Sequence, residues 1–237
     1  GETRGTGRAG PGAAGGTQVP ALAPGQLRVS TDIGDLAGCA LVVEAVFEDP
    51  GLKESVLRAV AEAASPDAVL ATNTSSISVD RLARSLPGPE RFLGMHFFNP
   101  VPVSDLVELV RGAATAEGVV AAARGWVEAL GKTPITVKDR PGFASSRLGV
   151  LLGLEAVRML EEGVASAEDI DAAMVLGYRH PMGPLRTTDL VGLDVRLGIA
   201  EYLTGALGER FRPPRLLVDK VARGELGRKS GRGFFDW

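Results

Sequence analysis

Four polar residues in the first half of the chain could take part in proton-transfer and binding chemistry. His96 is one of only two histidines, and histidine suits proton transfer near neutral pH because its ordinary pKa is about 6.5. Asn73, Ser75 and Asn99 are the other three. All four are expected at or just after the ends of strands. The carboxyl ends of parallel strands meet at the crevice where open α/β sheets bind ligands.

Each of these residues also has a structural interpretation. A lone histidine beside a strand is more often a packing or hydrogen-bonded residue than a catalyst. Ser75 could cap a helix expected over residues 77–86, and Asn99 precedes Pro100 as a turn former. The residues alone therefore leave a structural and a catalytic interpretation open.

The elements that must position these residues alternate between strands and helices. The apolar runs 40–46 (ALVVEAV) and 68–73 (AVLATN) are typical of strands buried on both faces of a sheet. Further strands are expected at 27–31, 91–97 and 134–138, and helical patterns at 32–38, 50–64, 77–86 and 116–131. This alternation with short connections predicts a doubly wound, Rossmann-like α/β sheet.

From Pro141 onward the sequence shows helical patterns without strand signals. Ser166 and Asp169 have the spacing of a capping box. Helices are expected over 147–162, from 166 to about 175, over 189–207 and over 214–223. We therefore predict a partial sheet domain over 27–140 and an all-helical domain over 141–237.

Residues 1–26 form a segment rich in Gly, Pro, Ala and Thr with almost no large apolar side chain. Such a segment cannot bury enough surface to offset its ordering entropy, so we predict disorder there. The net charge of −3 gives no reason to expect nucleic acid or an anionic membrane as a partner. The single cysteine, Cys39, excludes an internal disulfide framework and favours the cytoplasm. We expect no secretory signal in the first residues, no membrane-spanning run and no metal site.

Six segments together resemble the L-3-hydroxyacyl-CoA dehydrogenase family, and within it the bacterial 3-hydroxybutyryl-CoA dehydrogenases. They are EAVFED, ATNTSSIS, ERFLGMHFFNPVPVSDLVELVRG, DRPGF, HPMGPLRTTDLVGLD and GRKSGRGFFDW. They follow the family's order and spacing from about residue 27 to residue 237. The resemblance implies NAD-dependent oxidation of a short-chain L-3-hydroxyacyl-CoA in fatty-acid metabolism. It also implies a homodimer formed through the helical domain.

The resemblance assigns catalytic roles to four residues. His96 resembles the base that takes the proton from the substrate 3-hydroxyl, and Glu108 resembles the carboxylate that orients the imidazole and favours its charged form. Ser75 resembles the serine whose hydroxyl meets the substrate oxygen. Ser146 stands where family members usually carry the asparagine of PGF-x-x-N-R; serine keeps a hydroxyl but is shorter. Without the resemblance, Glu108 could equally be a solvated charge on an amphipathic strand.

Cofactor contacts are also implied for four residues. Asn99 resembles a ligand of the nicotinamide carboxamide, and Ser75 resembles a serine that lies beside the nicotinamide. Glu48 and Lys53 resemble cofactor-contacting residues in the loop after the 40–46 strand. Either of these two charged residues could instead be a surface charge.

The dinucleotide fingerprint departs from the family pattern. Family members begin with a strand, a G-x-G-x-x-G turn and a helix. Residues 5–10 (GTGRAG) match the motif literally, but no apolar strand precedes them and Pro11 follows at once. We therefore expect that residues 5–10 do not bind pyrophosphate. The family's helical hairpin, which contacts the CoA moiety, also has no counterpart in this sequence. Three functions stay open: the NAD-dependent dehydrogenase, a catalytically impaired remnant that lacks the phosphate-binding loop, and a dehydrogenase of a free hydroxy acid.

Overall fold

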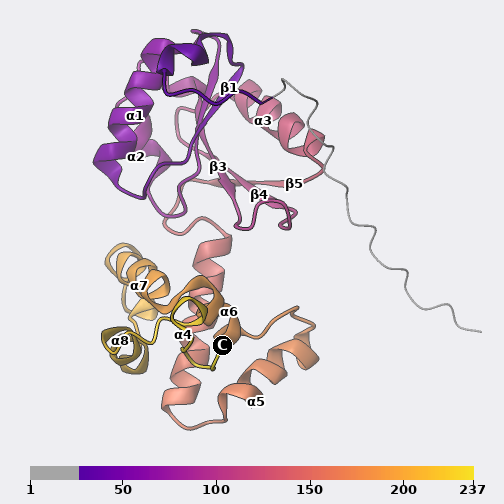
Figure 1. Cartoon of the computed structure of the whole chain (residues 1–237), viewed down its shortest axis with the longest axis vertical. Coiled ribbons are helices and arrows are strands. Elements are labelled where there is room, and N and C mark those ends of the chain that lie inside the picture. The colour runs from indigo at the N-terminus through magenta and orange to yellow at the C-terminus, as the bar shows by residue number, and fades with distance from the viewer. Residues whose placement is uncertain (1–26) are drawn as a thin grey trace, which may run out of the picture.

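The computed structural model describes residues 27–237. The disorder predicted for 1–26 and the GTGRAG motif therefore lie outside the described residues. Figure 1 shows two units, a sheet covered by helices and a helical bundle, with helix α4 (Ser145–Glu161) extending from the bundle toward the sheet. No helix in this described part is both long and apolar enough to cross a lipid bilayer.

The sheet has five strands in the order β1–β2–β3–β4–β5. Their bounds are β1 Leu41–Glu44, β2 Val69–Thr72, β3 Phe92–Phe97, β4 Leu106–Arg111 and β5 Thr133–Lys138. The first three strands run parallel, β4 runs antiparallel to β3, and β5 runs parallel to β4. The Rossmann-like prediction is confirmed in a mixed form. The β3–β4 register sets His96 directly opposite Glu108.

One strand prediction at the start of the sheet is wrong, and a second is confirmed only in part. Residues 27–30 form no strand, because they are exposed and pair with no other strand. The run 40–46 forms a strand only over Leu41–Glu44, and it is not buried on both faces, since Val43 is 36% exposed. Within the described sheet β1 is an edge strand, so the apolar run has a neighbouring strand on one side alone.

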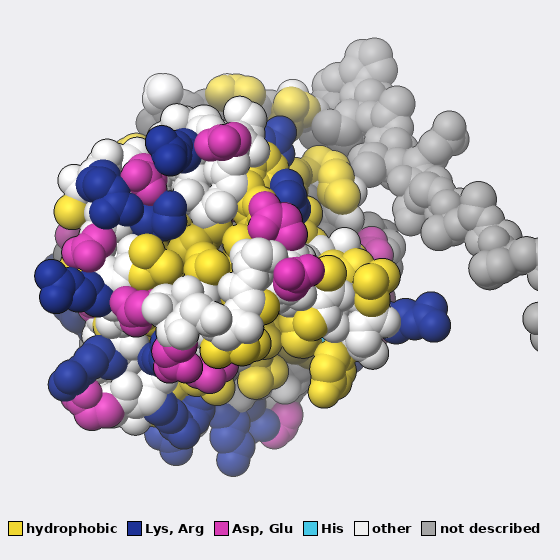
Figure 2. Space-filling model, turned by 90° about the horizontal axis from the view of Figure 1, so that it is seen from below, with side chains coloured by type: hydrophobic (Ala, Val, Ile, Leu, Met, Phe, Trp, Pro, Cys, Tyr) yellow, Lys and Arg dark blue, Asp and Glu magenta, His cyan; other side chains and the backbone are white. Residues whose placement is uncertain are grey.

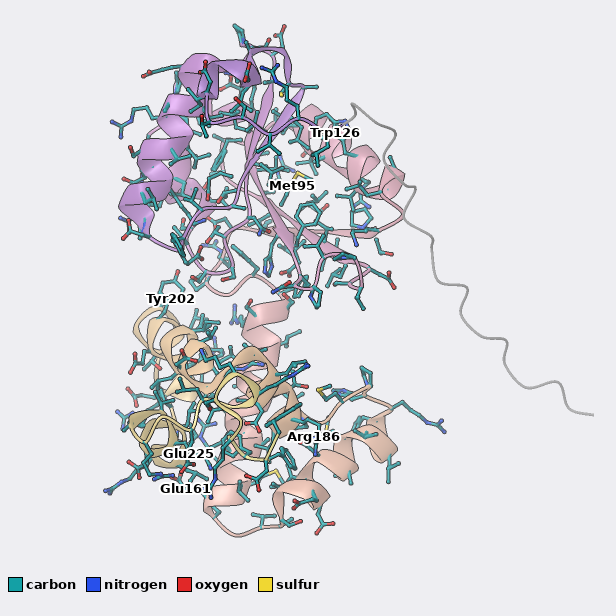
Figure 3. The ribbon with its side chains drawn as sticks, viewed as in Figure 1. Met95, Trp126, Glu161, Arg186, Tyr202 and Glu225 are labelled. Atoms are coloured by element: carbon teal, nitrogen blue, oxygen red, sulfur yellow. The ribbon has the colours of Figure 1, made fainter. Side chains whose placement is uncertain are left out.

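Helices cover both faces of the sheet. Their bounds are η1 Ile33–Gly38, α1 Pro50–Ala63, α2 Val79–Ala83, η2 Pro89–Arg91 and α3 Glu117–Ala129. Asp49 caps α1 by accepting a hydrogen bond from the amide of Leu52 at 2.7 Å. Because side chains alternate along a strand, Phe92 packs with the α1 and α2 cluster, whereas Met95 packs with the α3 cluster. Figure 3 shows Met95 close to Trp126 of α3.

Helices and short helical turns make up the second unit. They are α4, α5 Ala167–Ala172, the π-helical turn η3 Ala173–Gly177, α6 Pro184–Val191, α7 Leu193–Leu207, η4 Glu209–Phe211, α8 Arg215–Ala222 and η5 Arg228–Ser230. Ser166 caps α5 by accepting from the amide of Asp169 at 3.1 Å, as the capping-box spacing predicts. The single helix predicted over 189–207 is wrong. Gly192 adopts φ +103°, which ends α6 and separates it from α7.

The two units meet where α4 and α7 approach the sheet. A Cβ atom at Gly142, just before α4, would lie 3.1 Å from the side chain of Leu203 on α7. Figure 3 shows Tyr202 at the end of α7 that is nearest the sheet unit. Burial, and then the charge of Asp139, raises the pKa of Tyr202. The segment after β5 therefore runs beside α7 before it enters α4.

A tight backbone approach in the helical unit yields a stability prediction. Asp171 is buried and accepts hydrogen bonds from the amides of Leu185 and Arg186, at 2.8 and 2.9 Å, in the first turn of α6. A Cβ atom at Gly183 would lie only 2.1 to 2.5 Å from atoms of Asp171. Gly183→Ala should therefore lower the free energy of unfolding by about 2–4 kcal/mol, measured by thermal or urea unfolding.

Gly198 in α7 provides the matched control, because a Cβ atom added there would meet no neighbouring side chain within 4 Å. Gly198→Ala should leave stability unchanged or raise it by up to about 1 kcal/mol through helix propensity. Equal melting temperatures for Gly183→Ala and the wild type would contradict the predicted clash.

Candidate active site

A histidine–carboxylate pair lies at the centre of the candidate site. Nδ1 of His96 on β3 lies 2.9 Å from Oε2 of Glu108 on β4, and their side chains are 9% and 0% exposed. Glu108 is therefore not a solvated charge on an amphipathic strand. With Nδ1 engaged as donor to the carboxylate, Nε2 is the imidazole nitrogen that can accept a proton. No hydrogen bond from the described residues occupies that nitrogen.

Glu108 also connects the sheet to the first turn of α4. Its Oε1 accepts hydrogen bonds from the amides of Ala144 at 3.1 Å and Ser145 at 3.0 Å, and Oε2 accepts one from the Ser145 hydroxyl at 2.5 Å. Burial raises the pKa of Glu108, but the hydrogen bonds from His96 and Ser145 outweigh it, so the pKa lies below its ordinary value. The carboxylate is therefore charged at neutral pH and fixes the imidazole.

Ser145 is a residue of the candidate site that sequence reasoning missed. The sequence singled out Ser146, which is half-buried and whose hydroxyl makes no hydrogen bond within the described part of the chain. Helical geometry separates neighbouring side chains by about 100° around the axis, so only one of the two serines can face Glu108. The available signal was the position of Ser145 just before the helix expected over 147–162, because amides and hydroxyls at a helix start attract a carboxylate.

Glu48 organises the turn that carries Ser75. Its Oε1 accepts hydrogen bonds from the Thr74 hydroxyl at 2.5 Å, the Ser75 amide at 3.1 Å, and both the amide and hydroxyl of Ser76 at 3.2 and 3.0 Å. The Ser75 hydroxyl lies at the outer limit of hydrogen bonding, 3.5 Å from the same oxygen. Ser75 does not cap α2, because Ser78 is the N-cap residue. The Ser75 hydroxyl is thus weakly engaged on a firmly held turn.

Lys53 is buried rather than on the surface. Its side chain is 1% exposed, and its ammonium group donates to Oε1 of Glu44 at 2.8 Å and to the carbonyl of Val46 at 3.1 Å. Oε2 of Glu48 lies 3.4 Å away. The surface-charge interpretation is therefore wrong for Lys53. The network holds the loop after β1 against α1 and fixes the carboxylate that organises the Ser75 turn.

A pH-dependent prediction follows from Glu48. Burial raises its pKa, but the Thr74 hydrogen bond, the charge of Lys53 and the contacts with Ser76 and Ser75 lower it below the ordinary 4.5. A carboxylate with a depressed folded pKa stabilises the fold above pH 4.5, and this stabilisation is lost as pH falls through the folded value.

Glu48→Gln should therefore melt several degrees below the wild type at pH 7, and the gap should narrow as pH drops below about 4.5. Thermal melts between pH 7 and pH 3 measure it. Glu62→Gln, an exposed change on α1, should show no such gap. A gap for Glu48→Gln that stays constant down to pH 3 would contradict the assignment.

The two asparagines differ in their environments. Oδ1 of Asn73 accepts a hydrogen bond from the amide of Phe97 at 2.8 Å, which joins the ends of β2 and β3 next to His96. Asn99 follows β3, is exposed, and its side chain makes no hydrogen bond within the described residues. Asn73 thus holds the strand end that carries His96, while the Asn99 amide is available to a ligand.

Several residues at this sheet edge leave an aromatic ring or a polar group open to a ligand. Phe47, in the loop after β1, is 87% exposed and presents an aromatic ring beside the Glu48 turn. The amide of Asn99 and the hydroxyl of Ser75 are uncommitted or weakly engaged donors at the ends of the neighbouring strands. An exposed ring with free polar groups at the carboxyl ends of parallel strands suits a planar, hydrogen-bonding ligand.

Fold and site together define an oxidoreductase with a Rossmann-like sheet and a helical C-terminal unit. The family model described as 3-hydroxyacyl-CoA dehydrogenase, NAD binding domain, matches residues 16–140. The model of the C-terminal domain of the same family matches residues 142–237. The chain belongs to the 3-hydroxyacyl-CoA dehydrogenase family, whose members are NAD-dependent.

Individual relatives agree with this family. A probable 3-hydroxybutyryl-CoA dehydrogenase of Deinococcus radiodurans is 43% identical over 222 residues, which are 93% of this chain and 80% of the relative. A 3-hydroxybutyryl-CoA dehydrogenase of Mycobacterium tuberculosis is 46% identical over 216 residues, covering 90% of this chain and 76% of the relative. The crystal structure of (S)-3-hydroxybutyryl-CoA dehydrogenase from Ralstonia eutropha superposes with a TM-score of 0.85 at 44% identity, covering 88% of this chain and 74% of that one.

Proposed function

We propose that this chain catalyses the NAD-dependent oxidation of a short-chain L-3-hydroxyacyl-CoA to the 3-oxoacyl-CoA. The observation that carries the proposal is the buried His96–Glu108 pair, with Nδ1 and Oε2 at 2.9 Å and Nε2 left available. His96 accepts the proton of the substrate 3-hydroxyl at Nε2, and Glu108 stabilises the resulting imidazolium. NAD, when bound, supplies the hydride acceptor for C3 of the substrate.

The other site residues bind and orient. The Ser75 hydroxyl hydrogen-bonds the substrate oxygen, and the Asn99 amide binds the nicotinamide carboxamide. Glu48 and Lys53 serve the cofactor by holding the loop after β1 and the Ser75 turn. Ser146, in the first turn of α4, faces the substrate beside the pair. Proton transfer accounts for only part of the rate enhancement. Alignment of C3 with the nicotinamide supplies much of the remainder.

The relatives' names support a short acyl chain, since all three of those cited are named for 3-hydroxybutyryl-CoA. A role in β-oxidation or butanoate metabolism in the cytoplasm fits this substrate. We assign nucleotide binding to residues 27–140 and assembly to residues 141–237.

A homodimer formed through the helical domain is supported by exposed apolar side chains there. Leu148 is 68% exposed, Leu176 is 77% exposed and Tyr178 is 74% exposed. Figure 2, viewed toward the helical unit, shows apolar side chains gathered over part of that face. Such exposure marks surfaces that associate. Sedimentation equilibrium measures the assembly, and a monomer at micromolar concentration would contradict it.

Reduction of acetoacetyl-CoA by NADH, followed by NADH absorbance, tests the activity. We expect turnover by the wild-type chain that depends on both reagents. Equal turnover of free acetoacetate would instead favour the dehydrogenase of a free hydroxy acid. An NADH fluorescence titration addresses the non-catalytic remnant. Micromolar NADH binding agrees with the dehydrogenase, whereas no binding together with no turnover contradicts it.

A further inference from the structure

Helix α7 carries a charged residue within its core-facing stripe. The buried positions of the helix are Leu193, Arg196, Ala200 and Leu203, which share one helical face. The three apolar members are 0% exposed, and Arg196 is only 6% exposed. A guanidinium group therefore occupies a position that helical patterning would assign to an apolar side chain.

Two glycines of α4 make room for this side chain. Helices α4 and α7 pack against each other in the bundle (Figure 1). A Cβ atom at Gly153 would lie 3.9 Å from Nε of Arg196, and one at Gly149 would lie 3.7 Å from Nη1. The side chain thus extends along α4 from Gly153 toward Gly149. Its guanidinium end points toward the N-terminal turn of that helix.

Arg196 has no counter-charge within the described residues. Its Nε is buried and makes no hydrogen bond there. The nearest acid in sequence, Asp194, projects roughly 200° away around the helix and pairs with Lys229 at 2.6 Å. Burial lowers the pKa of Arg196 to about 10, so the group remains charged at neutral pH. A buried, unpaired charge is costly, and its usual remedy is an anionic partner.

The guanidinium end lies on the side of α4 that leads to the reaction centre. Ser145 stands one helical turn before Gly149, about 6 Å along the axis. The Ser145 hydroxyl donates to Glu108 at 2.5 Å, and Glu108 holds His96. An anion that reached Arg196 from the substrate site would therefore approach along the first turns of α4.

We propose that Arg196 binds the carboxylate at the far end of a dicarboxylic acyl chain, so that the site accepts ω-carboxy-3-hydroxyacyl thioesters in addition to unsubstituted short acyl chains. The inference rests on the proposed function and names its substrate class. A guanidinium binds a carboxylate through two parallel hydrogen bonds, and the planar fork makes that recognition specific. The ligand carboxylate supplies the counter-charge that the described fold lacks.

Calorimetric titration of adipyl-CoA and hexanoyl-CoA tests this, since the two have equal chain length and differ in the terminal carboxylate. The wild-type chain should bind adipyl-CoA at least about tenfold more tightly. Arg196→Met should abolish the preference, and Arg196→Lys should retain part of it. Arg215→Met, at a residue whose side chain is 87% exposed, should keep it in full. An unchanged preference in Arg196→Met overturns the proposal. If Arg196→Met lost as much affinity for free CoA as for adipyl-CoA, the proposal would also be overturned. Arg196 would then bind the CoA phosphates.

Melts without CoA ligands separate this inference from the proposed function. Because Arg196 has no anionic partner among residues 27–237, Arg196→Met should melt at the same temperature as the wild type or above it. A fall of several degrees would show that the guanidinium is paired within the fold and would overturn the proposal. Millimolar adipate should raise the melting temperature of the wild type more than hexanoate does, and this difference should vanish in Arg196→Met. If neither thioester binds, the proposed function is wrong. The melts with adipate and hexanoate then still test whether Arg196 binds a carboxylate.

Discussion

His96→Gln should lower kcat for acetoacetyl-CoA reduction by about 10²–10⁴-fold while leaving the melting temperature nearly unchanged. Glutamine can still meet Oε2 of Glu108 with its amide, so the buried carboxylate keeps a donor at this position. What glutamine cannot do is exchange a proton near neutral pH. Steady-state kinetics at saturating NADH, together with a thermal melt, measure the two effects separately.

The other histidine provides the control. His180 lies outside the sheet, between η3 and α6, and His180→Gln should retain the wild-type rate. If His96→Gln kept full activity, the proton would be transferred by another group and the proposed mechanism would be wrong. If His96→Gln lost activity only because it unfolded, the melt would reveal it.

Glu108→Gln should affect both catalysis and stability. The two oxygens of Glu108 together accept from His96, from the Ala144 amide, and from the amide and hydroxyl of Ser145. A glutamine amide has only one acceptor oxygen, so in either orientation its NH₂ group meets donors. We expect a loss of about 1–3 kcal/mol in the free energy of unfolding. We also expect a fall in kcat of at least about 10²-fold, because the imidazolium loses its partner.

The pH dependence of the same residue has a definite sign. Its folded pKa is lowered below the ordinary 4.5, so the carboxylate stabilises the fold above that pH and the effect is lost as pH falls through the folded value. The stability difference between wild type and Glu108→Gln should therefore shrink in acid. Glu209→Gln, at a residue whose side chain is 70% exposed, should show neither effect. A rate for Glu108→Gln within twofold of wild type would contradict the role assigned to the pair.

Much of the sheet was predictable from local pattern. The strand over 91–97 and the helix over 50–64 agree with β3 and α1 to within one residue at each end, because apolar runs and helical spacing act over short distances. The prediction of one continuous helix over 189–207 is wrong because the helix breaks at Gly192. Gly192 takes a positive φ there, and glycine within a helical pattern does not by itself reveal whether the helix continues through it.

The candidate site divides in the same way. His96 and Glu108 could be named from the sequence because their motif is specific, and the β3–β4 register then places them opposite each other. The burial of Lys53 was not predictable, because it depends on contacts with Glu44 from β1 and with Glu48. These contacts form only when α1 packs against the sheet. A charged side chain on a helix is exposed by default, and only its neighbours can reverse that.

The sequence by itself determined the family and the proposed catalytic pair: a histidine suited to proton transfer and, twelve residues later, the carboxylate that it contacts. Tertiary structure decided which serine supports that carboxylate, because Ser145 meets Glu108 only when α4 docks against the sheet, 37 residues along the chain. Tertiary structure likewise decided that Arg196 is buried, because the glycines that admit it belong to another helix. Local pattern reports which side chains are available, whereas contacts between distant segments set their partners and their exposure to water.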